Sequence, residues 1–200
     1  MTERAGRDPD LPRCWWPDGV GRVDPAYVVY HDSEWGVPVI DDAELFERLA
    51  LESFQAGLAW VTILRKREAF RSAFRAFEPA VVAHFGARDR DRLMADAGIV
   101  RNGAKIDAVI GNAAGTLAII DEFGGLAPYF DRFVEHPPRR QPPGATMGDV
   151  PASTPEAEAL SADLRRRGFR FVGPTIVYAF MQSVGLVDDH LPGCFRYAGA

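Results

Sequence analysis

Cysteine and lysine are both scarce in this sequence. Of its 200 residues only Cys14 and Cys194 are cysteines and only Lys66 and Lys105 are lysines, so arginine supplies nearly all of the positive charge. The two cysteines lie at opposite ends of the chain, where a disulfide between them is one option and the histidines near them suggest another use. No apolar run approaches the roughly 20 residues of a membrane span. The N-terminus lacks the hydrophobic segment of a signal peptide, so we expect a soluble cytoplasmic protein.

A surplus of positive charge is missing as well. The formal net charge is −5 at pH 7, which argues against binding nucleic acid mainly through overall basicity but leaves room for a local basic face. Hydrophobic residues make up 47% of the chain, enough for a sizeable core. We expect residues 1–12 to be a flexible segment and residues 13–200 to form either one domain or two small lobes that share a cleft.

The sequence pattern is helical. Asp41 followed by Glu44 is typical of a helix N-terminus and predicts a helix from about Asp42. A period of 3.6 predicts a long helix over residues 104–120, and Asp89 predicts the start of the helix before it. No convincing pair of alternating strands is present, so we predict an all-α fold of about eight helices.

Residues 27–60 combine aromatic side chains with one misplaced carboxylate. In the helix predicted from Asp42, Glu52 falls in the middle of the apolar stripe and not on the solvent face. Aromatic rings around a buried anion suit a flat, electron-poor or cationic ligand. The alternative is that the aromatic residues are ordinary core residues, but a buried carboxylate needs a reason.

Two cysteines and two histidines have the spacing of metal ligands. His190 and Cys194 are four residues apart, and Cys14 and His31 can supply the other half of a Cys₂His₂ tetrahedron. Such a closed site would hold the two ends of the chain together and do no chemistry. Two free thiols with two ordinary histidines are the alternative.

Residues 96–113 read as helix, glycine-bounded turn, helix. Gly98 and Gly103 let the backbone approach a partner closely, and Lys105 stands at the start of the second helix. Exposed N–H groups at a helix start bind phosphate well. The segment therefore predicts either a helix-hairpin-helix element that holds a nucleic-acid backbone or a plain helical hairpin.

Six sequence blocks occur in one order along nearly the whole chain, from residue 13 to residue 197. They are CWW (14–16), YVVYHDSEWGVP (27–38), LESFQAGLAW (51–60), DAGIVRNGAKI (96–106), RRRGFRFVGPTIVYAFMQSVGLVDDH (165–190) and HLPGC (190–194). Together these blocks strongly resemble the bacterial DNA-3-methyladenine glycosylase I family. No Ser-His-Asp arrangement, Walker A loop or dinucleotide fingerprint points elsewhere.

The resemblance implies a fold, an activity and a metal. The fold is that of the helix-hairpin-helix glycosylase superfamily, with one glycosylase domain of two helical lobes around a base pocket. The activity is hydrolysis of the N-glycosidic bond of 3-methyladenine in double-stranded DNA, without lyase activity. A structural zinc ion, one per chain, joins the N- and C-terminal segments through Cys14, His31, His190 and Cys194. We expect a monomer with no evident protein partner and no membrane association.

The resemblance also implies roles for single residues. Glu52 matches the carboxylate that recognises the base, with electrostatic help to the departing base as a second role. Leu58 matches the residue that enters the gap left in the duplex. The base pocket is formed by Trp16, Tyr27, Tyr30, Trp35 and Trp60. The hairpin that binds phosphate contains Gly98, Arg101, Gly103 and Lys105.

The chemistry of these residue types agrees with that activity. Methylation at N3 makes adenine a cation and weakens its bond to the sugar. The protein therefore has to extrude the nucleotide, select the cation and hold it. Stacking on aromatic rings and a desolvated carboxylate both favour a positive ring, and neutral adenine would forgo this stabilisation.

Three residues depart from the family pattern. Ser53 and Phe54 stand where a Gly-Gln pair can occur, and Trp15 stands where a glycine can precede the pocket tryptophan. Phe54 lies opposite Glu52 on the helical wheel, so we expect an effect on packing more than a lost contact. Their effect on the breadth of accepted bases stays open.

Two other functions fit the same residues. One is a catalytically idle protein that binds alkylated bases or damaged DNA in the same pocket. The other is a zinc-stabilised structural module that binds unmodified DNA through residues 98–105. Release of free 3-methyladenine from methylated DNA distinguishes the enzyme from both.

Overall fold

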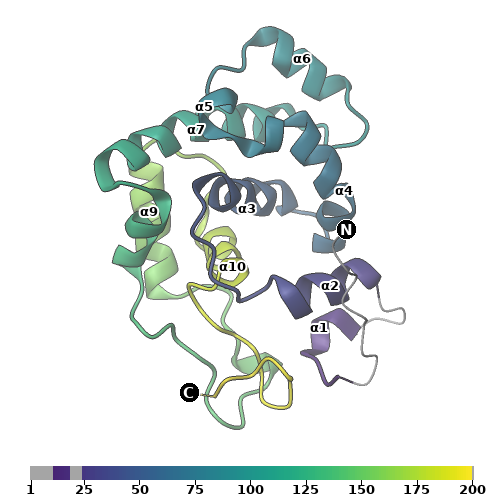
Figure 1. Ribbon diagram of the computed structural model, residues 1–200, viewed down its shortest axis with the longest axis vertical. Coiled ribbons are helices and arrows are strands. Elements are labelled where there is room, and N and C mark those ends of the chain that lie inside the picture. The colour runs from purple at the N-terminus through teal and green to yellow at the C-terminus, as the bar shows by residue number, and fades with distance from the viewer. Residues whose placement is uncertain (1–10, 19–23, 200) are drawn as a thin grey trace.

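The computed structural model of the chain describes residues 11–18 and 24–199 (Figure 1). Most of the segment 1–12, predicted to be flexible, lies outside the described residues. Short 3₁₀ helices are η1 (Arg75–Phe77), η2 (Asp131–Phe133) and η3 (Met147–Asp149). The α-helices are α1 (Trp15–Asp18), α2 (Pro25–Ser33), α3 (Asp42–Gln55), α4 (Trp60–Ala73), α5 (Pro79–Val82), α6 (Ala87–Ala95), α7 (Gly103–Phe123), α8 (Leu126–Phe130), α9 (Pro155–Arg166) and α10 (Pro174–Ser183).

The predicted all-α class is confirmed. Within the described ranges, β pairing is limited to one isolated bridge between Arg140 and Asp188. The sequence pattern missed α8, whose five residues are too few to show a helical period. A tertiary contact fixes this helix, because the Asp42 carboxylate accepts a hydrogen bond from the N–H of Leu126 (2.7 Å).

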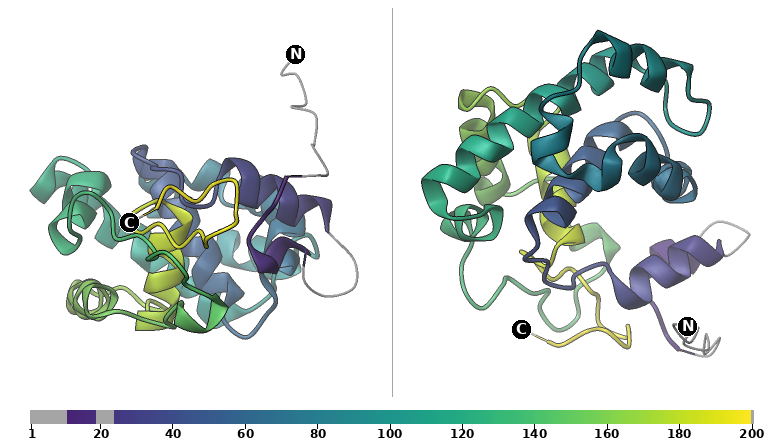
Figure 2. Two further views of the ribbon diagram at one scale, coloured as in Figure 1. Left: turned by 90° about the horizontal axis from the view of Figure 1, so that it is seen from below. Right: turned by 45° about the horizontal axis from the view of Figure 1, so that its top comes forward.

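Helix α3 runs through the middle of the molecule. It packs against α10, α4, α7 and α8. Figure 1 and both views in Figure 2 show α9 on one side of the α3–α10 pair and α1 with α2 on the other. The C-terminal segment returns to the start of the described chain, where the N–H of Phe195 donates to the carbonyl of Pro12 (2.8 Å). Segments far apart in sequence thus surround the end of α3.

Local chemistry explains where α3 begins and ends. Asp41 is extended (φ −74°, ψ 128°), and its side chain accepts a hydrogen bond from the N–H of Glu44 (2.9 Å). This is the N-terminal cap expected from the sequence. The helix ends at Gln55, and Gly57 then takes a positive φ of 79°, which favours glycine.

The two helices that the glycine-bounded turn joins start at other residues than expected. Helix α6 begins at Ala87 and not at Asp89, whose carboxylate instead accepts a hydrogen bond from the N–H of Gly86 (3.4 Å). Helix α7 begins at Gly103, and the Asn102 side chain caps it. A polar side chain can cap a helix either from the position just before it or from its first turn. The sequence therefore did not decide whether Asp89 precedes α6 or lies in its first turn.

Helix α7 is long and apolar enough, by length and composition, to cross a membrane. The core helix of a soluble protein meets the same criterion. About 44% of the most apolar stretch of α7 is buried inside the protein, where α7 packs against α3, α5, α6 and α8. These contacts account for its apolar character.

Phe54, one of the residues that depart from the family pattern, belongs to the core. Its side chain is fully buried, with its ring centroid 4.6 Å from that of Phe70 and 5.9 Å from that of Phe74. Its effect is therefore one of packing, on the face of α3 opposite to the one that carries Glu52.

We expect Phe54→Ala to lower the free energy of unfolding by about 3–5 kcal/mol, because it opens a cavity in the aromatic core. Urea unfolding followed by circular dichroism measures the change. The control is Phe171→Ala, which removes a ring that is 36% exposed and should cost about 1 kcal/mol or less. Equal losses for the two variants would contradict the assignment of Phe54 to the core.

Candidate base pocket and metal centre

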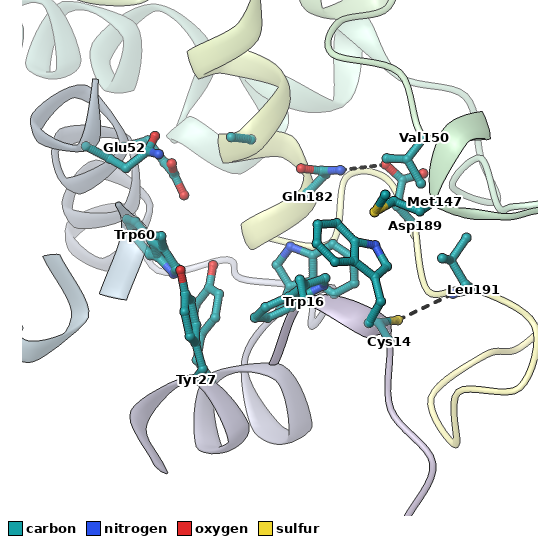
Figure 3. Close-up of a pocket in the computed structure, with 15 residues that line it drawn as sticks. Cys14, Trp16, Tyr27, Glu52, Trp60, Met147, Val150, Gln182, Asp189 and Leu191 are labelled. Carbon is teal, nitrogen blue, oxygen red and sulfur yellow. Dashed lines mark hydrogen bonds between the residues drawn. The ribbon is translucent and has the colours of Figure 1, made fainter. Parts of the chain in front are cut away.

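A cavity of about 360 Å³ opens where α1, α2, the end of α3, the start of α4 and α10 meet the C-terminal segment (Figure 3). The size is that of a small-molecule site. Glu52 and all five aromatic residues predicted for a base pocket line it. The other lining residues are Cys14, Trp15, Gln55, Met147, Val150, Ala179, Gln182, Asp189 and Leu191.

The aromatic wall is a connected set of rings. The Trp16 ring centroid lies 5.5 Å from that of Tyr27, 6.1 Å from that of Tyr30 and 5.2 Å from that of Trp35. The Tyr30 centroid lies 5.4 Å from that of Trp60. Two rings leave polar atoms available, because the indole N–H groups of Trp16 and Trp60 are buried and lack hydrogen-bond partners among the described residues. Such donors favour a ligand with hydrogen-bond acceptors.

Glu52 is the one acidic residue on the α3 side of this cavity. It lies beside Trp60 and across the cavity from Asp189 in Figure 3. Its side chain is only 5% exposed, which confirms the position on the buried stripe that the sequence predicted. Burial raises the pKa of Glu52 to about 8, and the positive charge of Arg48 opposes this rise. The pocket thus holds a carboxyl group whose ionisation needs a nearby positive charge.

The wall opposite Glu52 contains polar residues that sequence reasoning missed. The buried carboxylate of Asp189 accepts hydrogen bonds from Gln141 Nε2 (2.6 Å), the Tyr178 hydroxyl (2.5 Å) and Gln182 Nε2 (2.7 Å). This network fixes the orientation of the Gln182 side chain at the cavity. One signal was present in the sequence: Gln182 is a polar residue within the apolar run of α10.

The four residues with metal-ligand spacing do come together. Cys14, His31, His190 and Cys194 are all buried, and one candidate ligand atom from each lies within 4.8 Å of the other three. Cys194 Sγ lies 3.4 Å from His31 Nε2 and 3.6 Å from His190 Nδ1, and Cys14 Sγ lies 3.6 Å from the same His190 atom. Two sulfurs and two imidazole nitrogens at these separations can hold a metal ion.

The ring nitrogens that face away from this cluster are also held in place. His31 Nδ1 lies 2.8 Å from the carboxylate of Asp32, which in turn accepts hydrogen bonds from Arg13 (2.8 to 3.1 Å). His190 Nε2 lies 3.3 Å from the carbonyl oxygen of Trp35. Carboxylate and carbonyl partners of this kind orient histidines that bind metals. The Trp35 contact also links the cluster directly to the base pocket.

The residues predicted to contact DNA lie in two places. Leu58, between α3 and α4, is 38% exposed. Arg101 is exposed in the turn between α6 and α7, next to Gly98 and Gly103. Gly98 must be small, because a Cβ there would lie 2.9 Å from the Asp96 carboxylate and 3.0 Å from the side chain of Ala69.

Lys105 does not point outward. Its side chain is buried, and its ammonium group donates hydrogen bonds to the carbonyls of Phe54 (2.9 Å) and Ala56 (2.6 Å) at the end of α3. The Lys105 ammonium group is thus held inside the protein, and the DNA contact expected at this residue stays a prediction. The ammonium group is held there because the carbonyls at the end of a helix lack partners within the helix and attract a nearby cation.

The other two departures from the family pattern lie near the cavity. The hydroxyl of Ser53 is 2.9 Å from the carbonyl oxygens of both Leu49 and Phe171, so it ties α3 to the segment before α10. Trp15 is half exposed at the cavity. Ser53 therefore acts on the scaffold, whereas Trp15 is placed to touch whatever enters the cavity.

Comparisons with known proteins agree with each other. The family model described as Methyladenine glycosylase matches residues 20–197. The chain is 45% identical over 189 residues to DNA-3-methyladenine glycosylase 1 of Escherichia coli (strain K12), covering 94% of this chain and 98% of that protein. It is 43% identical over 182 residues to the DNA-3-methyladenine glycosylase of Haemophilus influenzae, covering 91% and 96%.

Solved structures are similar as well. A crystal structure of 3-methyladenine DNA glycosylase I has a TM-score of 0.85 at 45% identity, covering 92% of this chain and 99% of that one. A variant of 3-methyladenine DNA glycosylase I in complex with 3-methyladenine has a TM-score of 0.83 at 40% identity, covering 88% and 94%.

If the two cysteines and two histidines bind a metal, protein purified without added metal should contain about one metal ion per chain. Cys194→Ser should lose most of it, because the remaining three ligands leave the site open. Elemental analysis of the purified protein measures the content. His84→Ala, which changes an exposed histidine, is the control and should keep the metal. Metal retained in full by Cys194→Ser would exclude this ligand set.

For the pocket carboxylate, we expect Glu52→Gln to stabilise the fold at neutral and alkaline pH. Burial raises the folded-state pKa of Glu52 to about 8, above the unfolded value of about 4.3. Ionising Glu52 therefore destabilises the fold increasingly as the pH rises between these two values. The gain from glutamine should be absent near pH 4 and on the order of 5 kcal/mol at pH 8. Urea unfolding across this pH range measures it, and a gain that does not change with pH would contradict the raised pKa.

Proposed function

Since the chain belongs to the methyladenine glycosylase family, we propose that it excises 3-methyladenine from alkylated double-stranded DNA by hydrolysing the N-glycosidic bond. The family and the helical fold expected from the sequence are confirmed. The observation that carries the proposal is the buried carboxylate of Glu52 in a cavity walled by tryptophan and tyrosine rings. A flipped base of this kind has the shape and the charge that such a cavity favours.

Selection of the base rests on charge. A 3-methyladenine ring still attached to the sugar is a cation, so its entry places a positive charge beside Glu52 and favours the ionised carboxylate. Stacking on Trp60 and Tyr30 favours the same charge. Neutral adenine brings no charge, and with it Glu52 would stay protonated or would ionise without a partner. Discrimination between the two bases then comes from the cost of a buried, unpaired carboxylate.

Access to the base requires that its nucleotide leave the helix. Leu58 is an exposed apolar residue at the tip between α3 and α4, and such a side chain holds the base stack open. The turn from Gly98 to the start of α7 offers backbone N–H groups to a phosphate, with Arg101 exposed beside it. The Lys105 side chain takes no part, because it binds carbonyls of α3. DNA carrying the alkylated base is thus the binding partner.

Bond cleavage needs little chemical help from the protein. When the glycosidic bond breaks, its electron pair neutralises the cationic base, and water adds to the sugar carbon and releases a proton to the solvent. The Glu52 carboxylate stabilises the positive charge that the base carries until it leaves. Lyase activity is not expected: the ammonium groups of both lysines bind main-chain carbonyls, Lys105 as above and Lys66 at Ala97 and Gly98, so neither is free to form a Schiff base.

The metal in this proposal is a single zinc ion with a structural role. Zinc bound tetrahedrally by thiolate and imidazole places sulfur and nitrogen about 3.6 Å apart, close to the 3.4 to 3.6 Å between these atoms here. Four protein ligands leave no position for a substrate. The ion would hold the N- and C-terminal segments of a single domain, residues 13–200, around the pocket. We propose that the protein acts as a cytoplasmic monomer.

The test is release of free base from methylated duplex DNA. Wild-type protein should release 3-methyladenine and leave abasic sites without cutting the strand. Glu52→Gln should lower kcat/KM by about 10- to 1,000-fold, because the variant loses the charge that favours the cationic base in the pocket. Chromatography of the released bases measures the excision rate of wild type and of Glu52→Gln. The control is Ser53→Ala, a small change at the residue next to Glu52. It leaves every side chain that lines the cavity in place and should retain activity.

The alternative is a catalytically idle protein that binds the alkylated base or damaged DNA. The same pocket serves it equally well. Tight binding of free 3-methyladenine without release of any base from DNA would favour this alternative and overturn the proposal. Equal excision by wild type and Glu52→Gln would leave the enzyme in place and exclude Glu52 from the reaction.

A further inference from the structure

One buried cation near the pocket has a role that the base site alone does not explain. Arg48 lies on α3 one helical turn before Glu52 and is only 4% exposed. Its Nη2 atom lies 2.9 Å from the carboxylates of both Glu34 and Glu44. Its Nε and Nη1 atoms are buried and have no hydrogen-bond partner in the part of the chain that the structure describes. Most buried arginines have all of their N–H groups occupied, so this one is unusual.

The two carboxylates beside Arg48 have other partners that can compensate their negative charge. Glu34 also accepts two hydrogen bonds from Arg67, at Nη1 (2.5 Å) and Nη2 (2.9 Å). The Glu44 side chain is 41% exposed, and water can solvate it. If Arg48 served only to neutralise these two groups, burying two of its nitrogens without partners would be a cost with no return.

Arg48 lies between an outer groove, which it lines together with Glu34 and Glu44, and a residue of the base-pocket wall. Its guanidinium carbon lies 5.8 Å from the centroid of the Tyr30 ring, which lines the cavity together with Glu52. Side chains four residues apart on a helix are neighbours on one face, with Cβ atoms about 5–6 Å apart. Arg48 is also the one charged group that eases ionisation of Glu52 among the described residues.

The other ionisable groups near Glu52 do not supply a positive charge. From α2, Tyr27 and Tyr30 face it with hydroxyl groups whose pKa burial raises, and Glu52 adds to the rise. Lys105 of α7 is bound to carbonyls of α3. Helix α10 contributes Ala179 and Gln182 to the cavity, α4 contributes Trp60, and the C-terminal segment contributes Asp189, which its own donors hold.

We propose that Arg48 is a positioning residue for Glu52: its buried guanidinium lowers the cost of ionising that carboxylate and so sets the pH above which Glu52 is ionised in the empty pocket. The inference rests on the proposed function for its catalytic consequence. Arg48 touches neither base nor sugar in this role. Through Glu52 it determines how readily the pocket accepts a cationic base at neutral pH.

A resident cation has a defined consequence for base selection. In its absence the incoming base must supply all of the positive charge that ionises Glu52. A unit charge one helical turn away in a protein interior can change a pKa by roughly one to two units. Loss of Arg48 therefore acts on excision at neutral pH and fades where the pH is high enough to ionise Glu52 unaided.

The first experiment measures kcat/KM for 3-methyladenine release as a function of pH in wild type and in Arg48→Met. Methionine has a similar length and leaves Glu34 paired with Arg67. We expect the rising limb of the profile to move to higher pH by roughly one to two units, with about a 10- to 100-fold loss at pH 7. A structural defect would instead lower kcat/KM by one factor at every pH and would overturn the proposal.

Two further variants sharpen this result. Arg48→Lys keeps the charge and should return the profile most of the way to that of wild type. Arg71→Met is the matched control, because Arg71 borders the same outer groove but pairs with Glu47 and Glu68. Its profile should coincide with that of wild type. A displacement as large as that of Arg48→Met would show a general charge effect and overturn the assignment to Arg48.

The second experiment needs no enzymatic activity. The stabilisation gained by Glu52→Gln is measured against pH by urea unfolding, once with Arg48 and once with Arg48→Met. This gain levels off at the pKa that Glu52 has in the folded state, so the pH at which it levels off should move upward when Arg48 is absent, by the same displacement as the activity profile. If Arg48→Met does not fold, Arg48→Gln takes its place. An identical pH dependence in both backgrounds overturns the proposal.

These two experiments separate the inference from the proposed function. If wild type releases no base at any pH, the proposed function fails, but the unfolding measurement still decides the link between Arg48 and Glu52. If base is released and neither profile moves, the proposed function stands and the role of Arg48 is wrong.

Discussion

The burial of the Glu52 carboxylate in the middle of α3 is the constraint on which the site depends. A carboxylate in an apolar wall is costly unless a positive charge compensates it. The protein keeps this cost in the empty state, where burial raises the pKa of Glu52 to about 8. A cationic ligand removes the cost on binding. The surroundings of Glu52, aromatic rings on α1, α2 and α4 and a buried arginine behind it, all act on that one balance.

Keeping water away from Glu52 requires segments that are distant in the sequence. Trp16 and Tyr30 come from the N-terminal part of the chain, and Asp189 comes from the C-terminal part. The cluster of two cysteines and two histidines joins these same parts, and the Trp35 carbonyl beside His190 connects the cluster to the pocket wall. The cluster of cysteines and histidines and the aromatic cavity are therefore joined, and the cluster holds together the segments that form the cavity.

Much of this could be predicted from the sequence. Helical phase placed Glu52 on the buried face of α3, and residue spacing suggested two halves of a metal site, which the structure brings together. Other features could not be predicted. The direction of the Lys105 side chain depends on the end of α3, which is distant in the sequence, and α8 is defined by its contact with Asp42 and not by a period of its own.

The sequence by itself determined the helical class, the buried position of one glutamate, the four residues of the candidate metal site and the family. These follow from local periodicity and residue chemistry, which need no knowledge of distant contacts. Only the tertiary structure decided which side chains surround the carboxylate. It placed Gln182 and Asp189 opposite Glu52, turned Lys105 inward and left Arg48 beside Tyr30 with two unpartnered nitrogens. The pKa of a buried group depends on such neighbours, and they come together only when the chain has folded.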